Sequence, residues 1–308
     1  MSSIPLSKDN PFQPLIEKAN NNAALLQQTY ENHRFERNRL QAAKILAEDF
    51  PGWSVDEILM RLDGPKKEEG FLDPRNCLVL WARPPPAVRD LIGFIQNELK
   101  SRFPSIWLMP LENLHITVLE AAHSLTEDQI EELVQSFLSS KEVTPSDIAA
   151  YPRSHPTRLI KPMVSFDSAA LALSFVPAAG RDLKPESGSD SEDYTYHHLR
   201  RDIFDLVRHA NVDVAPRYSV PSAHVTIARF ISQDGFVARE ADGTETVDPS
   251  RVKSLIGKIG EINQNLENEY WPREGAVKEG GEWLVGEDSL VIRRGRLWYG
   301  GGENVPLN

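Results

Sequence analysis

A four-residue pattern that occurs twice, 109 positions apart, constrains the fold of this chain more than any other feature. The copies are His115-Ile116-Thr117-Val118 and His224-Val225-Thr226-Ile227, and both are rich in β-branched residues. Successive side chains of a strand point to opposite faces, so in each copy the histidine and the threonine share one face. The apolar residues take the other face, which helices can cover. The polar face of each copy must therefore meet solvent, a ligand or the other copy.

The segments around the two copies follow the same order, which predicts one structural unit built twice. From residue 76, the patterns run strand, helix, strand, helix, strand pair, helix, strand, helix, strand pair. The expected strands are 77–83, 107–120, 161–168, 170–178, 223–232, 282–294 and 296–301. The expected helices are 88–103, 125–140, 195–212 and 250–270.

The first 70 residues differ from the rest of the chain. Residues 15–50 are polar, lack proline and glycine and contain many good helix formers, so we expect a helix there. Pro51-Gly52 ends it, and Ser54-Val55-Asp56-Glu57 has the pattern of a cap and first turn of a short helix that runs to Leu62. A linker follows. These features predict a helical extension over residues 1–70, packed on or tethered to a domain over residues 71–308.

Charge and composition limit the partners of the protein. The 308 residues carry a formal net charge of −11, so long-range electrostatics oppose binding to long nucleic acids. No apolar run approaches the roughly 18 residues that a membrane-spanning helix requires, so we expect no membrane partner. The one cysteine, Cys77, cannot form an internal disulfide, and the first residues lack the features of a secretory signal. The expected location is the cytoplasm, with the nucleus as the second choice.

Two histidines and two threonines that face each other would form a minimal site for phosphoryl transfer. Cleavage of a phosphodiester needs a base for the attacking oxygen and an acid for the leaving oxygen, and imidazole can serve as either near neutral pH. Threonine hydroxyls can donate hydrogen bonds to the phosphoryl oxygens without a metal. The candidate catalytic residues are therefore His115, Thr117, His224 and Thr226. Provisionally, His115 is the base and His224 the acid.

Over about residues 76–300 the chain resembles the two-histidine (2H) phosphoesterase superfamily, whose members carry two His-x-Thr/Ser motifs about this far apart. Leu114-His115-Ile116-Thr117 and the run from His224 to Arg229 are similar to its motif strands. Trp81-Ala82-Arg83-Pro84 is similar to the Trp-Ala-x-Pro that ends the first strand of the plant enzymes. The superfamily includes RNA 2′,3′-cyclic phosphodiesterases (also called RNA 2′,5′-ligases), plant and yeast cyclic phosphodiesterases, and vertebrate domains that cleave 2′,5′-oligoadenylates.

The resemblance implies an α+β fold in which two pseudo-symmetric lobes of antiparallel sheet and helices enclose a central cleft, with no cofactor and no required metal. It makes Trp81 a candidate for stacking a nucleobase. Tyr218, shortly before the second motif, is a candidate contact for phosphate or sugar. The N-terminal extension and the acidic loop 180–193 depart from the family pattern, and one hypothesis is that they cover the cleft. The remaining histidines, including His197-His198, are expected to be structural or to lie at the surface.

These observations predict a metal-independent cyclic phosphodiesterase that hydrolyses a small cyclic nucleotide or a 2′,3′-cyclic phosphate. The acidic net charge favours a small nucleotide or a short RNA end as its partner. Three alternatives stay open, namely an enzyme that processes RNA ends, a nucleotide-binding module without turnover, and a 2H scaffold adapted to other acid–base chemistry. For the enzyme we expect a bell-shaped dependence of rate on pH, with one imidazole neutral and one protonated.

Overall fold

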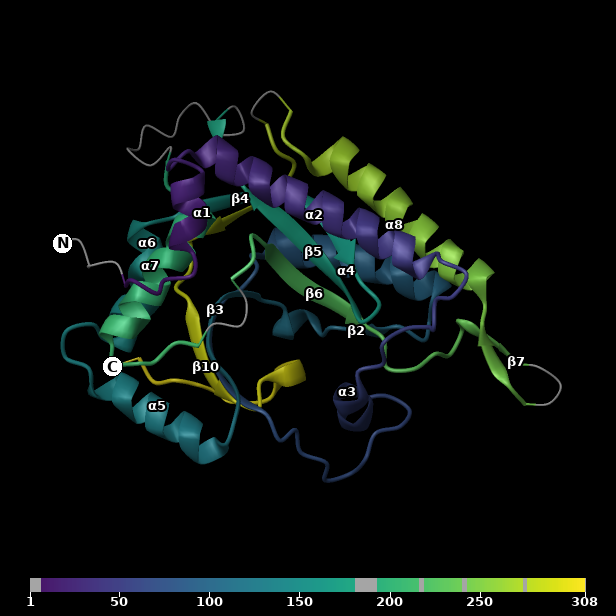
Figure 1. Cartoon of the computed structure of the whole chain (residues 1–308), viewed down its shortest axis with the longest axis horizontal. Coiled ribbons are helices and arrows are strands. Elements are labelled where there is room, and N and C mark those ends of the chain that lie inside the picture. Colours follow the sequence, from purple (N-terminus) through teal and green to yellow (C-terminus); the bar gives the residue numbers. More distant parts are fainter. Residues whose placement is uncertain (1–6, 181–192, 216–218, 240–242, 274–275, 308) are drawn as a thin grey trace.

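The computed structural model describes residues 7–180, 193–215, 219–239, 243–273 and 276–307, and its architecture is α+β (Figure 1). The helices are α1 (Gln13–Lys18), α2 (Ala23–Ile45), α3 (Glu57–Leu62), α4 (Pro86–Arg102), α5 (Glu127–Ser139), α6 (Pro145–Ser154), α7 (Tyr196–His209) and α8 (Pro249–Tyr270). The strands are β1 (Asn76–Ala82), β2 (Trp107–Leu108), β3 (Ile116–Leu125), β4 (Thr157–Phe166), β5 (Ala170–Pro177), β6 (Ala223–Arg229), β7 (Val237–Arg239), β8 (Glu245–Val247), β9 (Glu282–Val285), β10 (Val291–Gly295) and β11 (Glu303–Asn304). Short 3₁₀ turns are η1 (Leu111–Asn113) and η3 (Trp298–Gly300).

One antiparallel sheet dominates the molecule and confirms the expected fold class. Its strand order is β11-β10-β1-β3-β6-β5-β4-β9, and β2 pairs with β6. The strands that carry the two His-x-Thr copies, β3 and β6, are therefore central neighbours. Helix α5 packs against β1 and β3, and α7 against β3 and β4, whereas α4 packs against β6 and α8 against β4. In the part of the chain that the structure describes, no helix is long and apolar enough to span a membrane.

Where the elements differ from those expected, the cause is local. Helix α6 was not expected, although Thr144 forms a capping box with Asp147 and Pro145 stands in the first turn. The loop after β6 contains the hairpin β7–β8. Residues 296–301 were expected to form a strand, which is wrong, because they contain turn η3, in which Tyr299 has a positive φ of 64°. Of the acidic loop expected at 180–193, residues 181–192 lie outside the described residues.

The long N-terminal helix expected over residues 15–50 is in fact two helices, α1 and α2. Asn20 and Asn21 separate them with φ angles of 51° and 56°. Asparagine adopts this left-handed region more readily than most residues. Asn22 then begins α2, since its side chain accepts a hydrogen bond from the backbone nitrogen of Leu25 at 3.0 Å. Helix-forming composition did not reveal that three consecutive asparagines interrupt the helix.

The N-terminal extension packs on the sheet and shares its core. The buried residues Ala23, Leu26, Tyr30 and Arg34 recur every three or four positions, so they form one stripe along α2. This helix lies across β4 and β5 (Figure 1). Tyr30 and Phe12 belong to the same hydrophobic cluster as the residues of the central strands.

Two buried histidines of α7 fasten the extension. The Nε2 atom of His197 lies 3.0 Å from the carbonyl oxygen of Phe12, so Nε2 carries the proton and Nδ1 accepts from the Tyr30 hydroxyl at 2.9 Å. Nε2 of His198 lies 2.9 Å from the side-chain oxygen of Asn21. Burial lowers the pKa of His197 to about 3 and that of His198 to about 4. Both rings are therefore neutral, structural groups at neutral pH.

Acid is expected to destabilise the attachment of the extension. The pKa of histidine is about 6.5 in an unfolded chain, so the unfolded state binds protons more readily than the folded state. The free energy of unfolding should fall as the pH drops below about 6.5, by about 1.4 kcal/mol per pH unit for each such histidine, until the folded pKa is reached. Thermal unfolding at several pH values measures this slope. His197→Gln should show a shallower slope than the natural protein, and equal slopes would contradict the prediction.

Candidate active site

The pairing of β3 with β6 brings the two His-x-Thr copies side by side. Ile116 lies opposite Val225 in this antiparallel pair, and both side chains are buried, with 1% and 0% exposed. One step along the chain in either direction places the histidine of each copy opposite the threonine of the other. These four side chains lie on the face opposite to that of Ile116 and Val225. The alternation seen in the sequence thus describes the local geometry of both strands.

A cavity of about 250 Å³ opens on this face, and His115, Thr117, His224 and Thr226 all line it. Much of the remaining lining is aromatic or titratable, and includes Trp81, Glu120, His123, Arg229, Trp298 and Tyr299. A larger cavity of about 610 Å³ lies beyond Trp298 and Tyr299, which line both. The larger cavity includes none of the four candidate residues, so the chemistry suggested by the sequence belongs to the smaller one.

His115 is held by a backbone carbonyl and by an indole ring. Its Nδ1 atom lies 2.7 Å from the carbonyl oxygen of Asn113. A carbonyl can only accept a hydrogen bond, so Nδ1 carries the proton and Nε2 is the basic nitrogen of the neutral ring. Trp81 stacks on the imidazole, with ring centroids 3.7 Å apart and ring planes 16° apart. Both contacts fix the orientation of the ring.

His224 has a different partner. The hydroxyl oxygen of Ser222 lies 3.1 Å from its Nδ1. A hydroxyl can donate to Nδ1, and the neutral ring then carries its proton on Nε2. With this arrangement the two imidazoles have complementary tautomers, one with a basic Nε2 and the other with a protonated Nε2.

A buried arginine behind the site joins the segments that carry the two histidines. Arg200 of α7 is 2% exposed. Its Nε donates to the carbonyl oxygen of Val118 in β3 at 3.1 Å, and its Nη1 donates to that of Val220, just before β6, at 2.9 Å. No short sequence pattern indicated this role, because the partners lie 82 and 20 positions away.

Both candidate histidines, His115 and His224, are neutral in the protein without a ligand. Although each ring reaches the cavity, the surrounding protein desolvates it, and this lowers the pKa of His115 to about 3. The hydrogen bond to the Asn113 carbonyl opposes that shift, and the positive charge of Arg83 adds to it. Desolvation, followed by the charges of Arg200 and Arg37, lowers the pKa of His224 to about 4. A bound anion would offset these charges and raise both pKa values.

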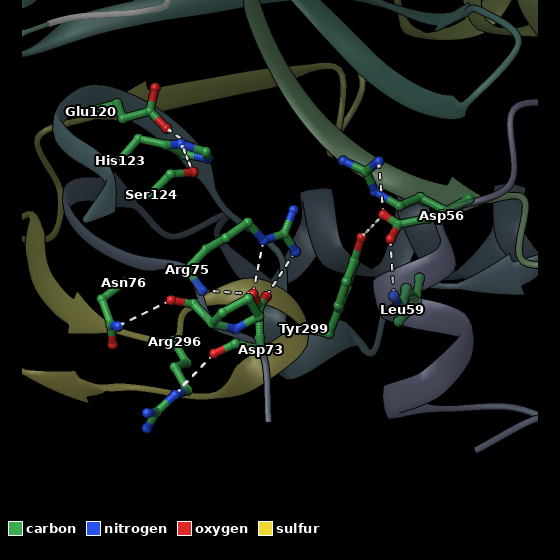
Figure 2. A network of polar contacts seen from close by, with 12 residues as sticks. Asp56, Leu59, Asp73, Arg75, Asn76, Glu120, His123, Ser124, Arg296 and Tyr299 are labelled. Atoms are coloured by element: carbon green, nitrogen blue, oxygen red, sulfur yellow. Dashed lines mark hydrogen bonds and ion pairs between the residues drawn. The ribbon is translucent and has the colours of Figure 1, made fainter. Parts of the chain in front are cut away.

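Asp56 ties the N-terminal extension to the cavity wall (Figure 2). One of its carboxylate oxygens caps α3 by accepting from the backbone nitrogen of Leu59 at 2.9 Å. The other accepts from the Tyr299 hydroxyl and lies 3.4 Å from Nη1 of Arg229. Because Tyr299 and Arg229 both line the cavity, a residue of the extension positions two parts of its wall. Sequence reasoning identified Asp56 only as part of a helix start.

Glu120 and His123 also belong to the cavity, which the sequence reasoning missed. Thr117, Glu120 and His123 are three residues apart, so a regular strand would point them to alternating faces. The register between β1 and β3 shifts between Leu80 and Trp81 and again between Leu78 and Val79. Such bulges insert an extra residue and re-aim the side chains that follow. His123 lies 3.9 Å from the Glu120 carboxylate and 2.5 Å from the Ser124 hydroxyl (Figure 2).

The two candidate substrate contacts have different outcomes. Trp81 lines the cavity but is only 5% exposed. Beside the stacked His115, the guanidinium carbons of Arg83 and Arg293 lie 5.0 and 5.5 Å from its ring centre. A nucleobase could therefore stack on Trp81 only if one of these neighbours moved. Tyr218 lies outside the described residues.

Among the residues that the structure describes, no group of three or more His, Cys, Asp or Glu is placed to hold a metal ion. The sequence matches no protein-family model, and a comparison with curated proteins finds no match.

Two solved structures show a distant likeness. A conserved protein of unknown function from Agrobacterium tumefaciens is 10% identical, with a TM-score of 0.41 over 77% of this chain and 88% of that chain. Usb1 from Kluyveromyces marxianus is also 10% identical, with a TM-score of 0.35 over 76% of this chain and 99% of that chain. Likeness at this level assigns neither a family nor an activity.

Proposed function

We propose that the protein is a metal-independent phosphodiesterase of the 2H type, which hydrolyses a small cyclic nucleotide or a 2′,3′-cyclic phosphate. One observation supports this above all others. Two His-x-Thr copies from distant parts of the chain lie opposite each other on adjacent strands and line one cavity. Two imidazoles and two hydroxyls in that arrangement supply a base, an acid and donors for one phosphoryl group.

The proposed reaction is an in-line displacement at phosphorus. Nε2 of His115 accepts a proton from the attacking water as the new oxygen–phosphorus bond forms. Nε2 of His224 gives a proton to the leaving ribose oxygen as the old phosphorus–oxygen bond breaks. The hydroxyls of Thr117 and Thr226 donate to the non-bridging oxygens. The product is a phosphate monoester, and exchange with solvent returns the protons to their starting positions. Trp81 acts here as a positioning residue for His115.

The depressed histidine pKa values predict how rate depends on pH. The ratio kcat/KM reports the free protein, whereas kcat reports the substrate complex. His224 must be protonated to act as the acid, and its pKa is about 4 in the free protein, so kcat/KM should fall as pH rises above about 4. The negative charge of bound substrate favours the imidazolium, so the alkaline limb of kcat should lie at higher pH. Initial rates across the pH range measure both limbs. A kcat/KM that increases from acid to neutral pH would contradict the assignment.

Incubation with 2′,3′-cyclic AMP in the presence of EDTA, followed by chromatography, tests the proposed function. The expected result is conversion to adenosine monophosphate at an undiminished rate. Tight binding without product would instead favour a nucleotide-binding module. Strong inhibition by salt and a preference for oligonucleotides over mononucleotides would favour the processing of RNA ends.

A further inference from the structure

A second cavity adjoins the first on the same face of the sheet. It measures about 280 Å³, and Ser222, His224, Thr226 and Arg229 line both cavities. Helix α2 of the N-terminal extension forms part of its wall. We call this cavity the α2 pocket, and the residues that it does not share with the first include His33, Arg34, Arg37, Ser165, Asp167 and Ser174.

The lining of the α2 pocket is cationic in an otherwise acidic protein. Arg34, Arg37 and Arg229 contribute three guanidinium groups, against the single carboxylate of Asp167. The whole chain, in contrast, carries a net charge of −11. Along α2 the buried stripe is apolar at Leu26 and cationic at Arg34, where the helix lines the pocket together with residues of β6. Such a cluster beside His224 fits an anion.

An ion pair with Asp167 holds Arg37 in place and uses only part of its hydrogen-bonding capacity. Its Nη2 donates to Oδ2 of Asp167 at 2.5 Å. The other carboxylate oxygen accepts from the backbone nitrogens of Ala169 and Ala170 at 2.8 and 3.0 Å, so Asp167 is fixed by the turn between β4 and β5. A guanidinium has five N–H donors, and the side chain of Arg37 is 40% exposed. Arg37 can therefore keep this ion pair and still bind a phosphate.

Arg34 adds a buried positive charge to the wall of the α2 pocket. The residue is 4% exposed, and its Nη1 donates to the carbonyl oxygen of Lys161 at 2.5 Å. Its Nε and Nη2 are buried without a hydrogen-bond partner among the described residues. Burial lowers the pKa of Arg34 only to about 10, so the group stays charged at neutral pH. The guanidinium carbon also lies 5.2 Å from the centre of the Trp271 ring, which offsets part of the cost of its burial, so Arg34 contributes its charge to the pocket.

The two cavities share four lining residues, and together they are large enough for one nucleotide-sized ligand. Sites for small molecules usually measure about 300–1,000 Å³, and each cavity alone, at about 250 and 280 Å³, falls below that range. Together they fall within it. If His224 protonates the leaving ribose oxygen, the ribose must lie on the His224 side of the phosphorus. The substituent on its 5′ carbon can then extend toward α2.

We propose that the α2 pocket binds a second phosphate, carried on the 5′ oxygen of the ribose whose cyclic phosphate is opened between His115 and His224. This rests on the proposed function and narrows its substrate class to nucleotides with a phosphate on both sides of the ribose. Either a free 5′-phosphate or the diester that links a preceding nucleotide supplies the same chemistry.

Three probes and two matched variants test the proposal. The probes are adenosine 2′,3′-cyclic phosphate, the same compound with a 5′-phosphate, and a dinucleotide that ends in a 2′,3′-cyclic phosphate. Arg37→Gln removes a charge that lines the pocket. Arg39→Gln removes a charge from the same helix, where Arg39 is 67% exposed and pairs with Glu36, so it serves as the control.

For the natural protein, kcat/KM should be at least about tenfold higher for a probe with a second phosphate, which corresponds to about 1.4 kcal/mol. Arg37→Gln should remove most of that advantage, so that the ratio of kcat/KM between a doubly and a singly phosphorylated probe falls toward one, as a lost charge-assisted contact predicts. The ratio is the readout because the charge of Arg37 also lowers the pKa of His224, so the variant changes the rate on both probes alike. Arg39→Gln should change neither the preference for a second phosphate nor the rate on the singly phosphorylated probe. A preference for the 5′-phosphorylated mononucleotide over the dinucleotide would identify a free nucleotide as the substrate, and the reverse an RNA end.

The possible failures are distinguishable. Turnover of all probes at equal efficiency, or an equal loss on all probes in Arg37→Gln, would overturn the α2 pocket and leave the phosphodiesterase standing. If no probe is turned over but the 5′-phosphorylated probe binds more weakly to Arg37→Gln than to Arg39→Gln, the proposed function fails and the pocket stands. If the probes are neither turned over nor bound, both the proposed function and the α2 pocket are refuted.

Discussion

The variant His224→Ala is expected to retain the fold and lose about 10²- to 10⁴-fold in kcat, the range typical for removal of a general acid or base. The leaving oxygen would depart without a proton, while the hydroxyls of Thr117 and Thr226 would still bind the phosphoryl group. His115→Ala should lose a similar factor for the opposite reason, because the attacking water would keep its proton. Steady-state rates with 2′,3′-cyclic AMP measure both losses.

His155→Ala is a suitable control, since His155 stacks on Tyr151 with ring centroids 4.0 Å apart and lines neither the first cavity nor the α2 pocket. Its kcat should stay close to that of the natural protein. Circular dichroism should show that all three variants keep their secondary structure. Full activity of His224→Ala would rule out the two-histidine mechanism.

Replacing Arg200 with methionine is expected to give the largest loss of stability. The substitution keeps much of the apolar stem but leaves the carbonyl oxygens of Val118 and Val220 without their donor. Each unsatisfied buried carbonyl costs about 1–3 kcal/mol, and since Val220 is 38% exposed, the total should be about 2–4 kcal/mol. Loss of the link between β3 and the segment before β6 should also lower kcat.

Denaturation by urea measures this change, and Arg208→Met in the same helix is the matched control. Arg208 forms an ion pair with Asp213, whose side chain is 96% exposed. Exposed ion pairs contribute about 0–1 kcal/mol, so this variant should lose much less stability. Equal losses in the two variants would show that Arg200 does not hold the motif strands together.

The parts of the fold that follow from local patterns could be predicted from the sequence. The alternation in His115-Ile116-Thr117 and its second copy placed the polar side chains on one face, and the apolar partners Ile116 and Val225 are indeed buried. Local sequence patterns likewise located α4, α5 and α8 to within a few residues. These features depend only on neighbours along the chain, which the sequence lists in order.

The rest of the site depends on contacts between distant residues. Asp56 meets Arg229 and Tyr299 across 173 and 243 positions, and no periodic pattern links them. Two bulges in β3 place Glu120 and His123 in the cavity, although strict alternation would separate them. The pairing of α2 with β4 and β5 is equally non-local, so the sequence did not indicate that arginines of this helix line a pocket.

A crystal structure of the protein soaked with adenosine 2′-phosphate or 3′-phosphate, the candidate products, tests the central claim most directly. We predict that the phosphate lies between the two imidazoles, with oxygens about 2.6–3.2 Å from Nε2 of His115 and of His224, and within hydrogen-bond distance of both threonine hydroxyls. A nucleotide phosphate bound elsewhere, with both histidines left without contact to it, would contradict the account.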